Sequence, residues 1–240
     1  MTMRLDRLLA TLAVATRSGA RELIRTGRVQ LNGSIISNPA HKVQPGCPLK
    51  VDGVLLDTRT QRHLMMNKPA GLLTAASDSR HPTVFDLLPP LYKSCGCMPV
   101  GRLDKDTTGL LLFTTDGQIA HRLLAPKNRV PKVYEATVTG MLDNDDIARF
   151  AAGIALDNFM ALPSDLTIVA ANDLSSQAVI TVYEGKYHQV KRMFAALGHS
   201  VTALRRIQFG PIQLDPALSP GGYRELTDDE WHALTGTVAA

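Results

Sequence analysis

Two long segments in which apolar and polar residues alternate restrict the fold of this chain more than any other feature. KVYEATVTG (132–140) and QAVITVYEG (177–185) place an apolar side chain at about every second position, as expected for strands with one buried face. Other strand-like segments often follow one another directly along the chain. This order predicts an α+β fold with a mixed, mostly antiparallel sheet flanked by helices, and argues against a doubly wound parallel sheet.

The first quarter of the chain has a different pattern. Its leucines within residues 5–12 recur at i, i+3, i+4 and i+7, which is one face of a helix. Thr16 is placed to cap a second helix, and the pairs Asn32-Gly33 and Asp52-Gly53 are typical of tight turns between short strands. We therefore expect two helices and a few short strands, followed by the polar, linker-like segment DTRTQR (57–62).

These patterns divide the chain into two predicted domains. The region after the linker mixes strands with helix-like segments such as QIAHRLLAP (118–126) and QVKRMFAALG (189–198). The expected boundaries are a small N-terminal domain at 1–58, a linker at 59–63, a second domain at 64–234 and a C-terminal tail at 235–240.

Positive charge is concentrated in the first domain. Residues 1–60 contain nine Lys or Arg and four Asp or Glu residues, whereas residues 61–240 contain seventeen and eighteen. Four arginines lie outside the apolar stripe of the second helix, with Glu22 as the one acid among them: Arg17, Arg21, Arg25 and Arg28. A solvated helix face would explain such a run, but the charge asymmetry favours a surface that binds folded RNA.

The segments RLDRLLA (4–10), TRSGARELIRTGRVQLNG (16–33) and VDG (51–53) together resemble the ribosomal-protein-S-four-like RNA-binding domain. The resemblance implies that the two helices and the following loop contact structured RNA. Gly19 stands where many members have an acid, so the second helix is expected to lack the usual capping box. The candidate RNA-binding residues of this domain are Arg7, Arg17, Arg21, Arg25 and Arg28.

The cysteines indicate a reducing environment. Cys47, Cys95 and Cys97 have no disulfide-framework spacing, and no second Cys/His pair accompanies Cys95 and Cys97, so we expect free thiols. No apolar run approaches the length of a membrane span, and the N-terminus is interpreted as part of the folded protein and not as a signal peptide. A cytoplasmic protein with no membrane attachment is therefore expected.

The stretch GRLDKDTTGL (101–110) contains two neighbouring carboxylates, Asp104 and Asp106. It fits the D-x-D-x-T signature of haloacid-dehalogenase-type phosphatases, in which both acids help to position Mg²⁺. That motif should end a buried apolar strand, but here the strong strand GLLLFTT (109–115) comes after it. A Ca²⁺ loop is excluded because its sixth position is not glycine and its twelfth is not glutamate. A third interpretation is that Asp106 and Thr107 cap the turn into the strand.

The longer run GRLDKDTTGLLLFTTDG (101–117) resembles a sequence block of RNA pseudouridine synthases, specifically of the RsuA group. The resemblance implies an isomerase that converts uridine in RNA to pseudouridine without a cofactor or a metal. Further blocks stand in family order and, with the basic domain, cover nearly the whole chain: MNKPAG (66–71), HPTVFDLL (81–88), KVYEATV (132–138) and EGKYHQVKRMFAALGH (184–199).

Pseudouridine formation detaches the uracil ring from ribose, turns it and rejoins it through carbon, so it needs one carboxylate near the sugar. The resemblance assigns this role to Asp104, with Tyr134 stacking on the base and Lys191 as the basic partner. Helical spacing supports Lys191, because the apolar residues from 190 to 197 form one stripe that leaves it free. The alternatives are a tyrosine packed in the sheet and an ordinary surface lysine.

The resemblance also implies that the target base is flipped out of the RNA. Arg102 would fill the space that the base leaves or hold a phosphate, although an ion pair with Asp104 or Asp106 is the alternative. Lys68 is either a phosphate contact or an exposed lysine. Weaker candidates for RNA contacts are His188, Gln189 and Arg192.

We therefore predict site-specific isomerisation of a uridine in 16S rRNA by a single aspartate, with free rRNA or an assembling small ribosomal subunit as the partner. A synthase acting on 23S rRNA and an RNA-binding assembly factor without catalytic activity are the alternatives. The pair of carboxylates keeps a Mg²⁺ phosphatase open as a third. A monomer with no obligate protein partner is expected.

Overall fold

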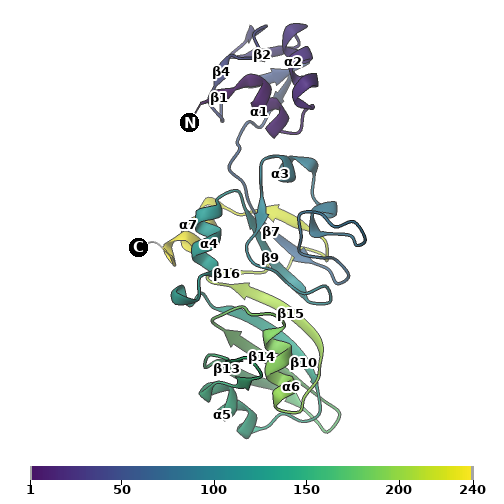
Figure 1. The fold of residues 1–240 in the computed structure, drawn as a ribbon, viewed down its shortest axis with the longest axis vertical. Helices are drawn as coiled ribbons and strands as arrows, with labels where there is room; N and C mark the ends of the chain where they lie inside the picture. The colour runs from purple at the N-terminus through teal and green to yellow at the C-terminus, as the bar shows by residue number, and fades with distance from the viewer. Residues whose placement is uncertain (1, 239–240) are drawn as a thin grey trace. The chain divides into compact units, whose positions relative to one another are not determined.

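The computed structural model describes residues 2–238. Their contacts form two compact units (Figure 1). The first unit contains the chain up to Arg62 together with Phe85–Met98, and the second contains His63–Val84 and the chain from Pro99 onward. Each unit has a hydrophobic core of its own. No helix in the described range is long and apolar enough to cross a membrane.

The first unit packs two helices, α1 (Leu5–Thr11) and α2 (Arg17–Arg25), against short antiparallel strands. The leucine face predicted for the first helix is confirmed, because Leu5, Leu8 and Leu9 are fully buried. One strand pair joins β1 (Met3–Arg4) to β4 (Lys42–Val43). A separate sheet has the order β3-β2-β5-β6 and consists of β2 (Val29–Leu31), β3 (Ser34–Ile35), β5 (Leu49–Val51) and β6 (Val54–Leu56).

Local sequence explains the ends of these elements. The Thr16 hydroxyl accepts a hydrogen bond from the Gly19 amide at 3.2 Å, so Thr16 caps α2 as predicted, without the reciprocal acid of a capping box. The two-residue turns Asn32-Gly33 and Asp52-Gly53 have positive φ at both positions. Asparagine, aspartate and glycine tolerate this conformation, which matches the twist of a hairpin.

A segment from the middle of the chain joins the first unit. It contains α3 (Pro90–Ser94) and begins within the 3₁₀ helix η1 (Val84–Leu87). Leu91 of α3 packs against the core of α1 and α2. Residues 85–98 fall inside the range expected for the second domain, and the apolar contact of Leu91 is the physical reason that they cluster with the first unit.

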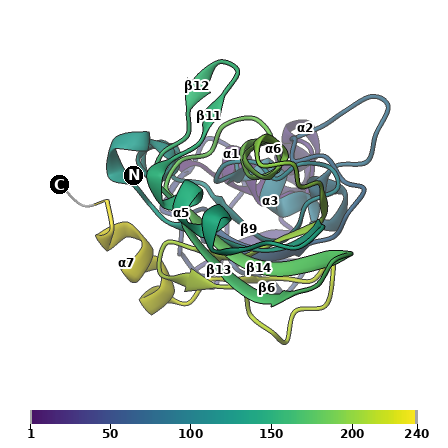
Figure 2. The ribbon, with the colours of Figure 1, turned by 90° about the horizontal axis from the view of Figure 1, so that it is seen from below.

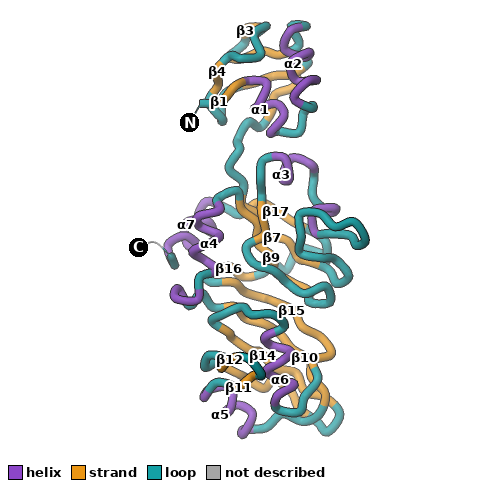
Figure 3. The backbone as a smooth tube through the Cα atoms, viewed as in Figure 1, coloured by secondary structure: helices purple, strands orange, loops and turns teal. Residues whose placement is uncertain are grey.

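The second unit is built on one large sheet with the strand order β13-β14-β10-β15-β9-β7-β17 (Figures 1 and 3). All neighbours along this order are antiparallel except β15 and β9, which are parallel. The predicted mixed, mostly antiparallel sheet is therefore confirmed. Its strands are β7 (His63–Lys68), β9 (Thr108–Thr114), β10 (Lys132–Thr139), β13 (Asp165–Ala171), β14 (Ser175–Val182), β15 (Val201–Phe209) and β17 (Tyr223–Glu225).

Shorter elements complete the second unit. They are the strands β11 (Ala155–Leu156), β12 (Phe159–Met160) and β16 (Ile212–Gln213), the 3₁₀ helix η2 (Pro126–Asn128), and the helices α4 (Gly117–Leu124), α5 (Asn144–Ala152), α6 (Gln189–Ala196) and α7 (Asp228–Gly236). The strand β8 (Met98–Pro99) pairs with β9 and begins at the last residue of the segment that joins the first unit. Helices α5 and α6 lie on the same face of the sheet (Figure 2), where the rings of Phe150 and Phe194 pack 4.9 Å apart. That face also carries the candidate site.

Burial follows the predicted periodicities. In β10 the side chains of Tyr134, Ala136 and Val138 are buried, while Glu135 and Thr139 between and beyond them are exposed. The β9 strand is different, because almost every residue of it is buried. It lies inside the sheet between β7 and β15, and its Leu110 and Leu112 belong to the same core cluster as apolar residues of α4 and α7.

Candidate active site

Hydrogen bonds from a buried lysine fix the loop that contains Asp104. Lys68, at the end of β7, donates hydrogen bonds from Nζ to the carbonyl oxygens of Asp104 (3.1 Å), Lys105 (3.3 Å) and Thr107 (2.9 Å), and also to that of Pro69 (3.0 Å). Its side chain is fully buried, and burial lowers the pKa of its ammonium group to about 8. The expectation that Lys68 contacts phosphate or is exposed was wrong. Its ammonium group is buried because it binds four backbone carbonyl oxygens.

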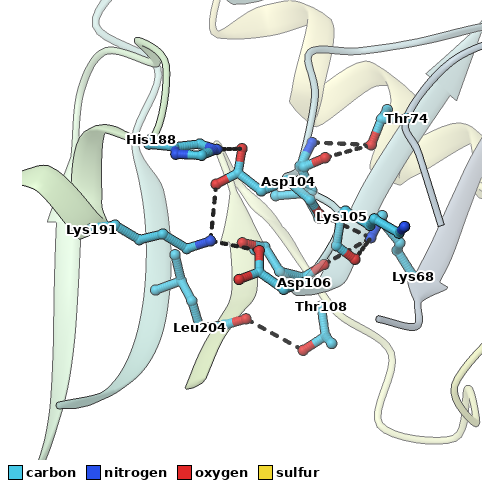
Figure 4. A network of polar contacts seen from close by, with 11 residues as sticks. Lys68, Thr74, Asp104, Lys105, Asp106, Thr108, His188, Lys191 and Leu204 are labelled. Carbon is cyan, nitrogen blue, oxygen red and sulfur yellow. Dashed lines mark hydrogen bonds and ion pairs between the residues drawn. The ribbon is translucent and has the colours of Figure 1, made fainter. Parts of the chain in front are cut away.

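Two further contacts fix the same loop (Figure 4). The Thr74 hydroxyl donates to the Leu103 carbonyl at 2.8 Å and lies 3.2 Å from the Leu103 amide, and the Gly71 amide donates to the Lys105 carbonyl at 2.7 Å. The backbone on either side of Asp104 is therefore satisfied by hydrogen bonds. This leaves the Asp104 side chain, with 28% of its surface exposed, to project from a rigid turn.

The Asp104 carboxylate faces two basic side chains from the start of α6 (Figure 4). Lys191 Nζ lies 3.4 Å from one carboxylate oxygen and His188 Nε2 lies 3.6 Å from the other. Lys191 Nζ also donates to Asp106 at 2.5 Å, which lowers the pKa of the Asp106 carboxyl. Lys191 thus bridges the two acids of the loop and places a positive charge between them.

This arrangement bears on the idea of a shared metal ion. A cation held by both carboxylates would have to displace the Lys191 ammonium group from between them. Within residues 2–238, no group of three or more His, Cys, Asp and Glu side chains is placed to hold a metal ion. Asp106 is also largely exposed, with 73% of its side-chain surface accessible, whereas Asp104 lies within a cleft.

The cleft has a volume of about 100 Å³ and is formed by the Asp104 loop, α6 and the inner face of β10, β14 and β15. Tyr134 of β10 lines it and is 9% exposed. The lining includes five Lys or Arg side chains and two acids, Asp104 and Glu184. A cleft with this excess of positive charge attracts an anionic ligand such as a nucleic acid.

The structure brings most of the predicted second-domain residues to this cleft. Asp104, Tyr134, Lys191, Arg102, His188 and Gln189 all line it. Gln189 is buried and donates to Glu184 at 2.9 Å, so it holds the cleft wall in place. Arg192 lies outside the lining, because its guanidinium donates to Asn158 at 2.8 Å beside the β11–β12 turn.

Three of the five predicted RNA-binding arginines of the first unit, Arg17, Arg21 and Arg28, lie beside acids. Asp6 is completely buried and accepts hydrogen bonds from Arg4 and Arg21, with Arg17 at 3.9 Å. Arg4 and, to a smaller extent, Arg21 hold the pKa of the Asp6 carboxyl well below its usual range.

Arg28 forms a pair of short hydrogen bonds with Asp52. Arg17, Arg21 and Arg28 nevertheless keep about half of their side-chain surfaces exposed. Arg7 and Arg25 are exposed as well.

Several residues of the cleft were not recognised from the sequence. Lys132 and Arg206 line it as buried cations, and Glu184 lines it as a buried acid. Lys132 could have been found, because it occupies an inward position in the alternation of β10, two residues before Tyr134. Arg206 could not, because it follows another arginine and the pattern does not show which of the two faces inward.

Comparisons with known proteins agree with this architecture. A family model described as RNA pseudouridylate synthase matches residues 62–196, and a model of the S4 domain matches residues 3–46. The chain is 42% identical over 234 residues to the uncharacterized RNA pseudouridine synthase YtzG of Bacillus subtilis, covering 97% of this chain and 98% of that protein. It is 41% identical to ribosomal small subunit pseudouridine synthase A of Vibrio parahaemolyticus, covering 95% and 97% of the two chains.

A second enzyme of that name, from Escherichia coli, is 40% identical over 95% of this chain and 98% of its own length. A solved crystal structure of a pseudouridylate synthase superimposes with a TM-score of 0.67 at 36% identity, covering 97% of this chain and 99% of that one. The predicted family and the predicted activity are thereby confirmed. The chain belongs to the RNA pseudouridylate synthase family and is an RNA pseudouridine synthase with an N-terminal S4 domain.

Proposed function

We propose that this enzyme converts a specific uridine of 16S rRNA to pseudouridine, that it flips the target base into the cleft, and that Asp104 alone supplies the reactive carboxylate. The observation that carries the proposal is the position of Asp104. It is a partly exposed acid on a rigid loop, in contact with Lys191 and in the same cleft as Tyr134.

The reaction requires an ionised carboxylate beside the ribose. Asp104 either attacks the anomeric carbon or removes a proton from the sugar while the bond to uracil N1 breaks. The Lys191 ammonium group lies 3.4 Å from the carboxylate and places a positive charge beside it. The firm attachment of the loop by Lys68 and Thr74 keeps the carboxylate in one orientation, which lowers the entropic part of the barrier.

The small size of the cleft around Asp104 supports base flipping. The carboxylate lies inside a cleft of about 100 Å³, which a base stacked within an RNA helix cannot enter. Extrusion of a nucleotide costs a few kcal/mol, and stacking on an aromatic ring restores about 1–3 kcal/mol. Tyr134 supplies such a ring, and the exposed Arg102 at the rim can occupy the space that the base leaves in the RNA.

The first unit supplies RNA affinity. Two arginines on α2 and Arg28, just before β2, keep about half of their surface exposed even where they contact Asp6 or Asp52. Arg7 and Arg25 add two more exposed cations. Phosphate contacts of this kind give affinity without reading sequence, so the choice of uridine depends on the shape of the folded RNA.

The assignment to 16S rRNA is supported by the named relatives from Vibrio and Escherichia, which match along almost their whole length. Mapping pseudouridines in rRNA from a strain that lacks this gene tests it. We expect one modification to disappear from 16S rRNA and to return when the gene is restored. Loss of a modification from 23S rRNA instead would show that the enzyme acts on the large subunit.

The role of the single aspartate is tested with two matched variants. Asp104→Asn should form no measurable pseudouridine while it binds the same RNA with nearly unchanged affinity. Asp106→Asn removes the neighbouring acid, which also contacts Lys191, and should retain activity within about tenfold of wild type because its carboxylate lies outside the cleft. Pseudouridine formed by Asp104→Asn would refute the assignment, and equal losses in both variants would show that the acids act as a pair.

A further inference from the structure

A buried arginine in the cleft wall has a hydrogen-bond donor without an acceptor. Arg206, on β15, is only 2% exposed. Its Nε donates to the Leu110 carbonyl at 2.8 Å, but its Nη2 has no hydrogen-bond partner in the described structure. Leaving a buried donor of a charged group unsatisfied is costly. Arg206 lines the cleft, so an acceptor on a ligand bound there would satisfy its guanidinium.

The surroundings of this guanidinium show what kind of ligand fits. Arg206 is the cross-strand partner of Tyr134, and its guanidinium carbon lies 6.0 Å from the centre of the Tyr134 ring. Both side chains line the cleft that contains Asp104. Arg206 therefore lies next to the ring on which the proposed function places the flipped base.

A second buried cation reinforces the positive charge at this place. Lys132 lies two residues before Tyr134 on β10, lines the same cleft and is almost fully buried, with Nζ donating to the Val130 carbonyl at 2.8 Å. Lys132 and Arg206 share a neighbour, because each lies 5.3 Å from the Phe209 ring centre. The other acid of the lining besides Asp104 is Glu184, which already accepts from the Leu162 amide and from Gln189. The wall formed by Arg206 and Lys132 is therefore suited to carbonyl oxygens or negative charge.

We infer that Arg206 donates a hydrogen bond from Nη2 to a carbonyl oxygen of the flipped uracil ring, and that Lys132 strengthens this contact electrostatically. The inference rests on the proposed flipping of a uridine onto Tyr134. A guanidinium can only donate hydrogen bonds, so it matches the two carbonyl oxygens of uracil. If the contact is to O4, the amino group of cytosine would place a donor against a donor and be rejected.

The same contact promotes the reaction. When the bond between the anomeric carbon and N1 breaks, its electron pair goes to the uracil ring, and the negative charge is shared by N1 and the carbonyl oxygens. The ring carbon C5 then bonds to the anomeric carbon and loses its proton, and N1 gains one, so the net change is an isomerisation. A hydrogen bond from Arg206 to a carbonyl oxygen is stronger in the detached, anionic base than in the substrate, and such differential binding raises kcat.

The inference is tested by combining changes in the enzyme and in the base. RNA carrying uridine, 2-thiouridine or 4-thiouridine at the mapped target, with tritium at C5, is given to the wild type and to Arg206→Gln, and release of tritium is measured. Sulfur accepts hydrogen bonds poorly, so one of the two thio-bases should slow the wild type about tenfold. Arg206→Gln should slow reaction of the uridine substrate about 10- to 100-fold, mainly in kcat, with no further loss on that thio-base.

The inference is overturned if Arg206→Gln reacts as fast as the wild type. It is also overturned if the rate loss caused by Arg206→Gln multiplies with the rate loss caused by the thio-base for both 2-thiouridine and 4-thiouridine. Arg205→Gln is the matched control, because Arg205 is the neighbouring residue on β15, is exposed and does not line this cleft. It should behave like the wild type with all three substrates.

Arg206→Lys covers the case in which Arg206→Gln does not fold. Lysine can still donate to the Leu110 carbonyl but has no counterpart of Nη2. We therefore expect Arg206→Lys to show no further rate loss on the same thio-base. Rate losses that multiply for both thio-bases would again overturn the inference. A wild-type enzyme that forms no pseudouridine in any rRNA would instead contradict the proposed function, which separates the two failures.

Discussion

Asp6 in the first unit and Asp104 in the second are both carboxylates that contact basic side chains, yet their surroundings differ. Asp6 is completely buried, and its two oxygens accept three hydrogen bonds from Arg4 and Arg21. Asp104 keeps 28% of its side-chain surface exposed, and no hydrogen bond reaches its carboxylate in the described part of the chain, although Lys191 and His188 are within ion-pair distance. Ion pairing alone therefore does not distinguish a structural acid from a reactive one.

The distinguishing feature is where the hydrogen bonds go. Around Asp6 they go to the side chain itself, which is thereby held and occupied. Around Asp104 they go to the backbone, where Lys68 and Thr74 bind carbonyl oxygens of the loop. The loop is fixed while the carboxylate oxygens stay available for a substrate. A reactive carboxylate needs both a fixed position and available oxygens, because an oriented carboxylate whose lone pairs are all occupied cannot react with a substrate.

Replacing each carboxylate by its amide should give opposite results. Asp104→Asn should reduce pseudouridine formation about 10³-fold or more and leave the free energy of unfolding unchanged, because no hydrogen bond to its oxygens is lost. Asp6→Asn should lower the free energy of unfolding by about 1–3 kcal/mol, with kcat at saturating RNA within about threefold of wild type. Urea unfolding and a tritium-release assay measure the two effects. Equal destabilisation by both changes would show that Asp104 is a structural acid like Asp6.

Replacing Lys68, which binds carbonyl oxygens of the Asp104 loop, should lower both activity and stability. Lys68→Met leaves buried carbonyl oxygens of the loop without a donor, which should lower the free energy of unfolding by about 2–4 kcal/mol and kcat about 10²-fold as Asp104 loses its orientation. Lys105→Met is the control within the same loop, because the Lys105 side chain is exposed, and it should leave both quantities unchanged. A fully active Lys68→Met enzyme would mean that the loop holds its geometry without these bonds.

Buried lysines make the stability of the second unit depend on alkaline pH. Burial lowers the pKa of Lys132 from 10.5 to about 8, so between these values the unfolded chain binds a proton that the folded chain does not. Stability must therefore rise with pH across this range. Compared with Lys132→Met, the wild type should gain at most about 3 kcal/mol between pH 8 and pH 10.5, measured by urea unfolding. A difference that is constant with pH would show that Lys132 stays charged in the folded state over this range, and that burial does not lower its pKa.

The sequence predicted those elements whose pattern is set by local contacts. Alternation located β10 and β14, leucine spacing located α1, and paired turn residues located the hairpins of the first unit. The resemblance of GRLDKDTTGL to a family block indicated the Asp104 loop, and helical spacing correctly left Lys191 off the apolar stripe of α6. These features depend on residues that are close in the chain.

The contacts that were not predicted join residues far apart in the chain. Lys68 is surrounded by apolar and polar neighbours that fit an exposed position equally well, and its burial depends on a loop nearly forty residues later. Asp6 reads as a polar residue between leucines, and its role depends on Arg21 of the next helix. Arg205 and Arg206 must face opposite sides of β15 because side chains alternate along a strand, but only the packed sheet shows that Arg206 is inside.

The smallest expected effect concerns the surface pair of Arg28 and Asp52, which are about half exposed and joined by two short hydrogen bonds. Asp52→Asn removes the negative charge but keeps the turn, because asparagine tolerates the positive φ that this position adopts. Stability should therefore change little. Arg28 is then free to contact phosphate, so RNA affinity should rise a few-fold and its dependence on salt should steepen by about one counterion. Filter binding of the target RNA over a range of salt concentrations measures both. An unchanged salt dependence would place Arg28 outside the RNA-binding surface and would restrict the first unit's contacts to the arginines on its helices.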